Sequence, residues 1–151
     1  MRKSWIGIAL AALLACPAAE ASSNRVGVGY SLYPRIGGLF ALRYSSFGFF
    51  LESGIRVVDA GESQILYGSK FAIRPYEYRG IPLEIGGSLG VDTNAAPDDT
   101  LIHGGVFVGL SSLVTDEIAI GVAVYPVAIG FGLPEDLYEF LTPTIDIHFL
   151  F

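Results

Sequence analysis

Charge is scarce in this 151-residue sequence, in which only 16 % of the residues are Asp, Glu, Lys or Arg. An ordinary soluble domain carries about 25 %. Basic residues are scarcer than acidic ones: the sequence has nine Lys and Arg and fifteen Asp and Glu, which gives a net charge of −6. We therefore expect no nucleic-acid partner, because binding a phosphate backbone needs an excess of positive charge. Disorder is also excluded, because 52 % of the residues are apolar.

Cysteine and tryptophan are almost absent, since Cys16 and Trp5 are the only ones. A single cysteine excludes a disulfide within the chain, so stability has to come from other interactions. Long helices are not expected either, because the sequence contains 19 Gly and 8 Pro, the two residues least favourable in a helix interior.

The N-terminal residues have the layout of a secretory signal peptide. Arg2 and Lys3 precede an apolar run at residues 5–15, and Ala19-Glu20-Ala21 matches an A-x-A cleavage site. We expect residues 1–21 to be removed on export, leaving residues 22–151 as one domain. The apolar run is shorter than the about 20 residues of a membrane-spanning helix. The alternative is a lipoprotein signal in which Cys16 is acylated and retained.

From residue 25 onward, large apolar residues alternate with small or polar ones, which is typical of strands with two different faces. Eight such segments are separated by turn residues: 25–32, 36–45, 47–57, 64–74, 81–91, 101–113, 118–124 and 144–151. The turns are expected at residues 33–35, 45–46, 59–62, 75–80, 92–99, 115–117 and 130–136. Because most connections are short, neighbouring strands should pair as antiparallel hairpins. The spacing of about sixteen residues suits membrane strands of about 9–11 residues plus a turn.

The two faces of these segments differ in kind. One face holds large apolar side chains, and the other holds Gly, Ala and Ser together with nine ionisable residues: Arg43, Glu52, Arg56, Lys70, Arg74, Glu84, His103, Asp146 and His148. In a soluble barrel or sandwich the charged face would meet water. The small residues suit the crowded interior of a narrow barrel better, so we expect the charges inside and lipid outside. An eight-stranded barrel is just wide enough to be filled by side chains. We therefore expect a closed interior of cross-strand ion pairs, with a narrow ion-conducting channel as the alternative.

The last segment ends on an aromatic residue. Ile145, Ile147, Phe149 and Phe151 share one face of it, and this ending resembles the C-terminal signal that the barrel-assembly machinery reads in bacterial outer-membrane proteins. Over residues 25–151 the chain resembles a small eight-stranded outer-membrane β-barrel of the OmpA/OmpX-like type. The resemblance implies an all-β, antiparallel up-and-down transmembrane barrel in the bacterial outer membrane. It also implies contact with outer-membrane lipid and lipopolysaccharide, insertion by the assembly machinery, and a monomer.

The chain departs from this family in its outward connections, which are short here and give little surface for an adhesin or receptor. The structural competitor is a helical membrane protein, because residues 101–115 and 118–134 carry no charge. Glycines, β-branched residues and Pro126 count against helices in both stretches.

No pattern points clearly to catalysis, so we expect a structural or lipid-interacting role with no catalytic residue, cofactor or metal. Ser111 and Ser112 share the segment of His103, which leaves a lipid A-modifying enzyme as an alternative, but no nucleophile-elbow pattern is present. Acidic residues gather in the expected loops, as a solvated rim or as a divalent-cation site: Asp59, Glu62, Asp92, Asp98, Asp99, Glu135, Asp136 and Glu139. Candidates for interfacial aromatic girdles are Tyr30, Tyr33, Tyr44, Tyr67, Tyr76, Tyr78, Tyr125 and Tyr138.

Overall fold

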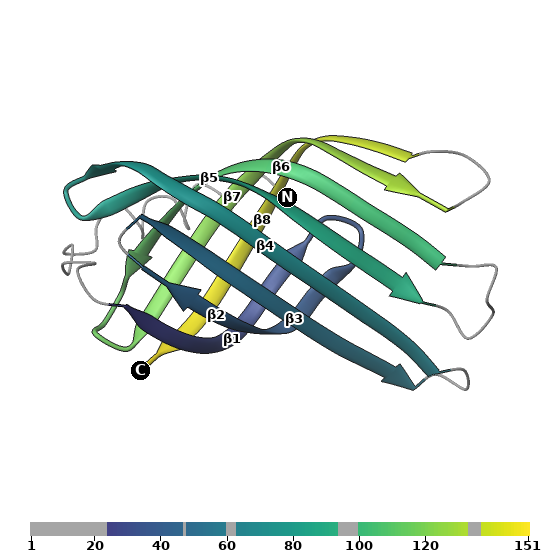
Figure 1. Ribbon diagram of the computed structural model, residues 1–151, viewed down its shortest axis with the longest axis horizontal. Helices are drawn as coiled ribbons and strands as arrows, with labels where there is room; N and C mark the ends of the chain where they lie inside the picture. Colours follow the sequence, from purple (N-terminus) through teal and green to yellow (C-terminus); the bar gives the residue numbers. More distant parts are fainter. Residues whose placement is uncertain (1–23, 47, 60–62, 94–99, 133–136) are drawn as a thin grey trace, which may run out of the picture.

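The computed structural model describes residues 24–46, 48–59, 63–93, 100–132 and 137–151, which form a closed barrel of eight strands (Figure 1). The strands are β1 (Arg25–Tyr33), β2 (Gly37–Ser45), β3 (Phe49–Asp59), β4 (Ser63–Tyr78), β5 (Ile81–Thr93), β6 (Thr100–Leu113), β7 (Ile118–Phe131) and β8 (Leu137–Leu150). Each strand pairs antiparallel with the next, and β8 closes the ring on β1. The predicted all-β, eight-stranded antiparallel up-and-down barrel is confirmed. The expected signal peptide lies outside the described residues.

The closing pair joins a short strand to a long one. β1 meets β8 from Gly27 opposite Leu150 to Ser31 opposite Asp146. β1 and β2 have nine residues each, whereas β4 has sixteen. The hairpin of β1 and β2 therefore stops short of the loop ends of the other strands, as Figure 1 shows. Within the described part of the chain, no helix has the length and hydropathy that a membrane crossing requires. The helical alternative is wrong for residues 101–113 and 118–131, which form β6 and β7.

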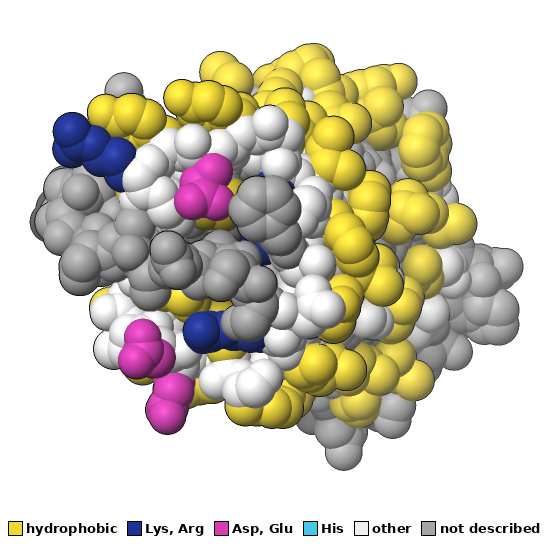
Figure 2. Space-filling view, turned by 60° about the vertical axis from the view of Figure 1, so that its left-hand side comes forward, with side chains coloured by type: hydrophobic (Ala, Val, Ile, Leu, Met, Phe, Trp, Pro, Cys, Tyr) yellow, Lys and Arg dark blue, Asp and Glu magenta, His cyan; other side chains and the backbone are white. Residues whose placement is uncertain are grey.

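The large apolar side chains face outward on all eight strands. Examples are Tyr30 on β1, Leu42 on β2, Val57 on β3, Phe71 on β4, Leu89 on β5, Val106 on β6, Phe131 on β7 and Phe140 on β8. Figure 2 shows this apolar covering over the side of the barrel, next to charged side chains at the end where the C-terminus lies. A soluble barrel has the opposite distribution, with its large apolar residues inside.

Two apolar clusters fill part of the interior. Tyr33, Ile36, Leu39 and Leu66 form one, and Phe50, Ala72, Phe107, Ala123, Tyr125 and Ala128 form the other. Inward glycines make room for the rings: a Cβ at Gly68 would lie 2.6 Å from the ring of Tyr33, and one at Gly105 would lie 2.9 Å from the ring of Tyr125. The interior is therefore packed with side chains, as expected for eight strands.

Four prolines of the described residues lie inside strands, and two of them, Pro75 and Pro126, lie where a strand continues past its predicted end. The turn expected at residues 75–80 is confined to residues 79 and 80, because β4 continues through Pro75 to Tyr78 with a register shift between Ile73 and Tyr76. A bulge tolerates proline, which has no N–H for the ladder. The turn itself is Arg79-Gly80, with φ of 52° and 76°, the two positive values that a type I′ hairpin requires.

The strands at the chain's end are also longer than predicted. β7 runs past residue 124 to Phe131, with Pro126 at a register shift in its pairing with β6. Opposite Pro126 in β8, Leu141 has a φ of 54°. β8 begins at Leu137, before the predicted start at residue 144. The outward connections are correspondingly shorter than predicted, because Tyr33, Asp59, Asp92 and Gly130 all belong to strands.

Candidate functional site

The polar interior of the barrel contains the nine ionisable residues that the alternation placed on one face. Seven of them are buried: Arg43, Glu52, Lys70, Glu84, His103, Asp146 and His148. Arg56 and Arg74 are partly buried on the same face of their strands. Most of the nine belong to one of two clusters, a central one around Lys70 and an end one around Glu84.

The central cluster joins strands that lie far apart in the sequence. The ammonium of Lys70 on β4 donates to the Ser31 hydroxyl of β1 at 2.7 Å and to Asp146 Oδ1 of β8 at 2.7 Å. The Ser31 hydroxyl in turn donates to the same Asp146 oxygen at 2.6 Å. Lys70 also lies over the ring of Tyr33, 4.5 Å from its centroid. These short charge-assisted contacts neutralise a lysine that is only 2 % exposed.

Glu52 on β3 is the second carboxylate of the central cluster. The Tyr33 hydroxyl donates to its Oε1 at 3.0 Å, and Lys70 Nζ lies 3.8 Å from the same oxygen. His148 Nε2 is 3.2 Å from Glu52 Oε2. The histidine on β8 thus lies against the carboxylate of β3.

In the end cluster, Glu84 on β5 accepts from three side chains through one oxygen. Its Oε1 lies 3.0 Å from Arg43 Nη2 of β2, 2.9 Å from Arg74 Nη2 of β4 and 2.6 Å from the Ser111 hydroxyl of β6. The guanidinium of Arg43 stacks 3.7 Å above the centroid of Phe50, and that of Arg74 lies 5.8 Å from it. Two positive charges are therefore held together by one carboxylate and one ring.

Two predicted interior residues stay outside these clusters. Arg56 Nη2 donates to the Ile36 backbone carbonyl at 3.1 Å. His103 is fully buried, and neither of its ring nitrogens has a hydrogen-bond partner among the residues that the structure describes. The pairing of His103 with Ser111 that a hydrolase would need is not formed, since Ser111 binds Glu84 instead.

The interior also contains tyrosines that the sequence reading placed at the membrane interfaces. Tyr33 and Tyr125 are 2 % and 0 % exposed inside the barrel, so their assignment to the aromatic girdles is wrong. The alternation indicates an inward position for Tyr33, because Tyr33 shares one face of its strand with Gly27, Gly29 and Ser31. The register shift near Pro126 obscures the same signal for Tyr125. The other candidates face outward: Tyr30, Tyr44, Tyr67, Tyr76, Tyr78 and Tyr138.

The acidic loop residues fall largely outside the described residues, namely Glu62, Asp98, Asp99, Glu135 and Asp136. Of the remainder, Glu139 pairs with Arg35 at 3.0 Å, and Asp92 accepts from Gln64 Nε2 at 2.6 Å. In the described part of the chain, no three His, Cys, Asp or Glu residues are grouped closely enough to hold a metal ion.

The C-terminal residues Ile147, Phe149 and Phe151 are exposed on the outer surface, and Ile145 is partly exposed on the same face. Phe151 exchanges two backbone hydrogen bonds with Val26. The final residue is therefore bound to the first strand.

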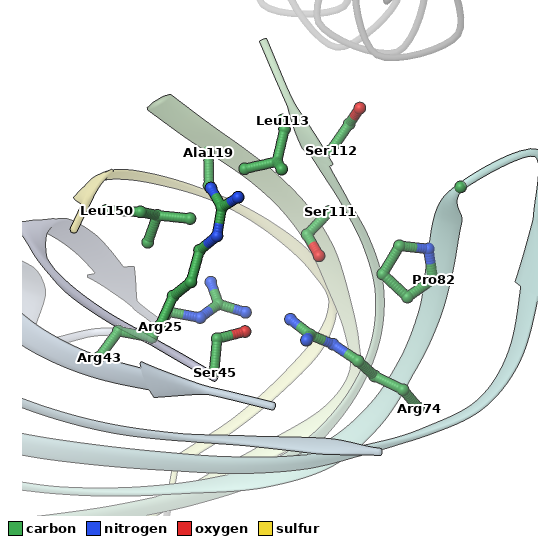
Figure 3. A pocket seen from close by; sticks show the side chains of 11 residues that line it. Arg25, Arg43, Ser45, Arg74, Pro82, Ser111, Ser112, Leu113, Ala119 and Leu150 are labelled. Carbon is green, nitrogen blue, oxygen red and sulfur yellow. The ribbon is translucent and has the colours of Figure 1, made fainter. Parts of the chain in front are cut away.

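A small pocket opens beside the end cluster (Figure 3). Its lining includes Arg25, Arg43 and Arg74, together with Ser111 and Ser112, and the Ser111 oxygen points toward the guanidinium groups of Arg43 and Arg74. Neither Arg25 nor this grouping is predicted from the sequence. Only strand pairing brings it together, because the arginines come from β1, β2 and β4.

Comparison of the chain with protein-family models, with curated proteins and with solved structures finds no match.

Proposed function

We propose that this protein is a small closed β-barrel of the bacterial outer membrane, with a structural or lipid-interacting role and no catalytic function. The observation that carries the proposal is the outward position of large apolar side chains on every strand. Phe140 on β8, Leu89 on β5 and Val57 on β3 are 68 %, 67 % and 64 % exposed.

Water is a poor environment for such a surface. Soluble monomers rarely expose continuous apolar patches of more than a few hundred Å², whereas here the apolar side chains surround the barrel. Acyl chains match this surface, and the closed ring satisfies the backbone hydrogen bonds that lipid cannot. The longer strands, β4 to β8, have 13 to 16 residues, more than the about 9–11 that a tilted membrane strand needs.

The exposed tyrosines fit the same proposal. Tyr44, Tyr76 and Tyr78 lie near the strand ends at the C-terminal end of the barrel, and Tyr138 lies near the start of β8 at the opposite end. Tyrosine is enriched at membrane–water interfaces, where its ring is partly apolar and its hydroxyl reaches water.

The packed interior favours a closed barrel over a channel. Apolar clusters fill the lumen, and the buried charges are bonded to one another across strands. A lipid A-modifying enzyme has no support from the serine and histidine geometry. In this proposal the partners are outer-membrane lipid, lipopolysaccharide and, during insertion, the barrel-assembly machinery. The signal peptide at residues 1–21 exports the chain, with acylation of Cys16 as the alternative, and the protein acts as a monomer.

Fractionation with a mobility test examines the proposal. Outer-membrane fractions run on a denaturing gel without boiling are expected to show a folded band that shifts after boiling, as for stable barrels. Soluble periplasmic proteins from the same cells provide the control. Recovery of the protein in the soluble fraction, with no mobility shift, would contradict the membrane location.

A further inference from the structure

Three hydroxyl groups interrupt the apolar outer surface of the barrel on β3 and β4. Ser53 and Ser69 are directly opposite each other in the two strands. Both serine hydroxyls donate to the Tyr67 hydroxyl oxygen, at 3.0 Å and 2.9 Å. Tyr67 is 45 % exposed, so the group lies on the outer surface and not in the lumen. We call these three side chains the hydroxyl cluster.

The hydroxyl cluster has one hydrogen-bond donor more than it can use. Three hydroxyls carry three protons, whereas only two hydrogen bonds join them. Because both serines donate to Tyr67, the proton of the Tyr67 hydroxyl has no acceptor among the residues that the structure describes. In an apolar environment a hydroxyl without a partner costs free energy. The cluster therefore needs an acceptor from outside the chain.

Large apolar side chains surround the hydroxyl cluster. Leu51 and Ile55 precede and follow Ser53 on the same face of β3, and both are exposed. Ile65 and Phe71 are exposed in the same way on β4. A ligand that covers the cluster therefore meets apolar side chains on both sides of the hydroxyls, and it has to be apolar around its acceptor.

The tyrosines of β4 indicate the depth of the cluster. Tyr76 and Tyr78 are exposed at the end of the barrel where the C-terminus lies. The segment from these residues back to Tyr67 is as long as a membrane strand, which has about 9–11 residues. Tyr67 therefore lies near the opposite boundary of the hydrocarbon layer. The ester carbonyls of lipids lie at this boundary, and a carbonyl oxygen accepts hydrogen bonds without donating any.

The surface next to the cluster has room for an acyl chain. Gly87 on β5 faces outward, because its cross-strand partners Phe71 and Val106 are both exposed. A Cβ added to Gly87 would meet only the backbone oxygen of Gly105, at 3.5 Å. The outer surface is therefore low at Gly87, toward the middle of the strands.

We propose that the hydroxyl cluster binds the ester carbonyl of a membrane lipid, with the Tyr67 hydroxyl donating to the carbonyl oxygen. Ser53 and Ser69 position the phenol by donating to its oxygen, and the acyl chain of the lipid runs over Gly87. This contact gives the lipid-interacting role a specific site, and it rests on the membrane location proposed above.

Vesicles of one lipid in two chemical linkages test the contact. Dioleoyl phosphatidylcholine has ester carbonyls, whereas its dialkyl ether analogue has the same headgroup and chain length but no carbonyl. Urea titration in both vesicles gives the ratio of the folding equilibrium constants in ester and ether lipid. Ser53→Ala/Tyr67→Phe/Ser69→Ala removes the three exposed hydroxyls and keeps the ring. We expect this variant to lower the ester-to-ether ratio about two- to tenfold, the effect of one hydrogen bond.

Tyr30→Phe is the matched control, because it removes an exposed phenol hydroxyl on β1, outside the cluster. Its ester-to-ether ratio should equal that of the parent. The heat-dependent gel shift establishes that each variant is folded.

Equal ratios for the parent and the triple variant would overturn the proposal. An equal decrease in Tyr30→Phe would also overturn it, because the effect would then belong to tyrosine hydroxyls in general. Both results leave the membrane location standing, since the parent has folded into the vesicles. A parent that inserts into neither kind of vesicle overturns the membrane location and this inference together.

Discussion

At the scale of single residues, Lys70 has the largest share of the interior charge balance. Its ammonium contacts Asp146 and Ser31 directly and lies 3.8 Å from Glu52. These partners come from β8, β1 and β3, and Lys70 itself comes from β4. One side chain therefore lies between two buried carboxylates and links four strands around the barrel.

Replacing Lys70 with methionine tests this role. Lys70→Met keeps much of the side-chain volume but leaves Asp146 and Glu52 buried without the ammonium. We expect a loss of about 3–5 kcal/mol in the free energy of unfolding, the usual cost of breaking a buried ion pair on one side. Urea unfolding of the protein in detergent or lipid, followed by the gel shift, measures it.

The double variant Lys70→Met/Asp146→Asn provides the comparison for this change. Removing the orphaned charge as well should recover part of the lost stability, because the penalty arises from the unpaired carboxylate. Arg79→Gln, which changes an exposed residue, should unfold as the parent does. Equal midpoints for the parent and Lys70→Met would show that Lys70 has no such role.

At the scale of the strand, the role of each side chain depends on whether it points into the barrel or outward. β6 illustrates this, because His103, Phe107 and Ser111 are buried while Ile102, Val106 and Val108 are exposed. The register shifts near Pro75, in the pairing of β4 with β5, and near Pro126, in the pairing of β7 with β6, let both strands continue past a proline. The outward face is thereby kept apolar along strands long enough to cross a bilayer.

An arginine on this outward face distinguishes lipid from water. Val106 lies at the middle of β6 and is 58 % exposed. In phospholipid vesicles, Val106→Arg is expected to lower the free energy of unfolding by about 2–4 kcal/mol, because the charge would lie in the acyl region.

Tyr138→Arg is the control for depth. Tyr138 is also exposed but lies at the start of β8, near the end of the barrel. A charge near the interface should cost only about 0–1 kcal/mol. If both variants have the same small effect, the middle of β6 is not in contact with acyl chains.

At the scale of the whole molecule, the barrel is closed around its circumference and filled along its axis. Tyr33, Phe50, Phe107 and Tyr125 lie inside it, and the rings of Phe107 and Tyr125 are 5.3 Å apart. The interior ion pairs pack against these rings, Arg43 over Phe50 and Lys70 over Tyr33. An open water column through the described residues is not compatible with this packing.

We therefore expect no steady current when the purified protein is incorporated in planar bilayers. The side chains that fill the lumen leave no continuous path for hydrated ions. Reproducible unitary currents that disappear in Glu52→Gln or Glu84→Gln would contradict this expectation and favour the channel alternative. A known porin in the same preparation provides the positive control.

The sequence by itself determined the number of strands, their antiparallel order and which residues share a face. The reason is that successive side chains of a strand point to opposite faces. The alternation of large apolar residues with small or polar ones can therefore be recognised in the local sequence. It also placed Glu52, Lys70 and Asp146 on one face. The strand ends near prolines could not be predicted as well, because a bulge depends on the pairing with the neighbouring strand.

Only the tertiary structure decided which side chains contact one another across the lumen. Lys70 and Asp146 are 76 positions apart, and their contact depends on closure of β8 on β1 and on the stagger of every strand between them. The same closure brings Arg25 beside Arg43 and Arg74. Local alternation determines whether a side chain points inward or outward. Which inward side chains then reach one another depends on the closure and stagger of the whole barrel. The scarcity of charge thus has a spatial meaning: the few charges are kept off the outer surface of the strands and are gathered inside the barrel and at its ends.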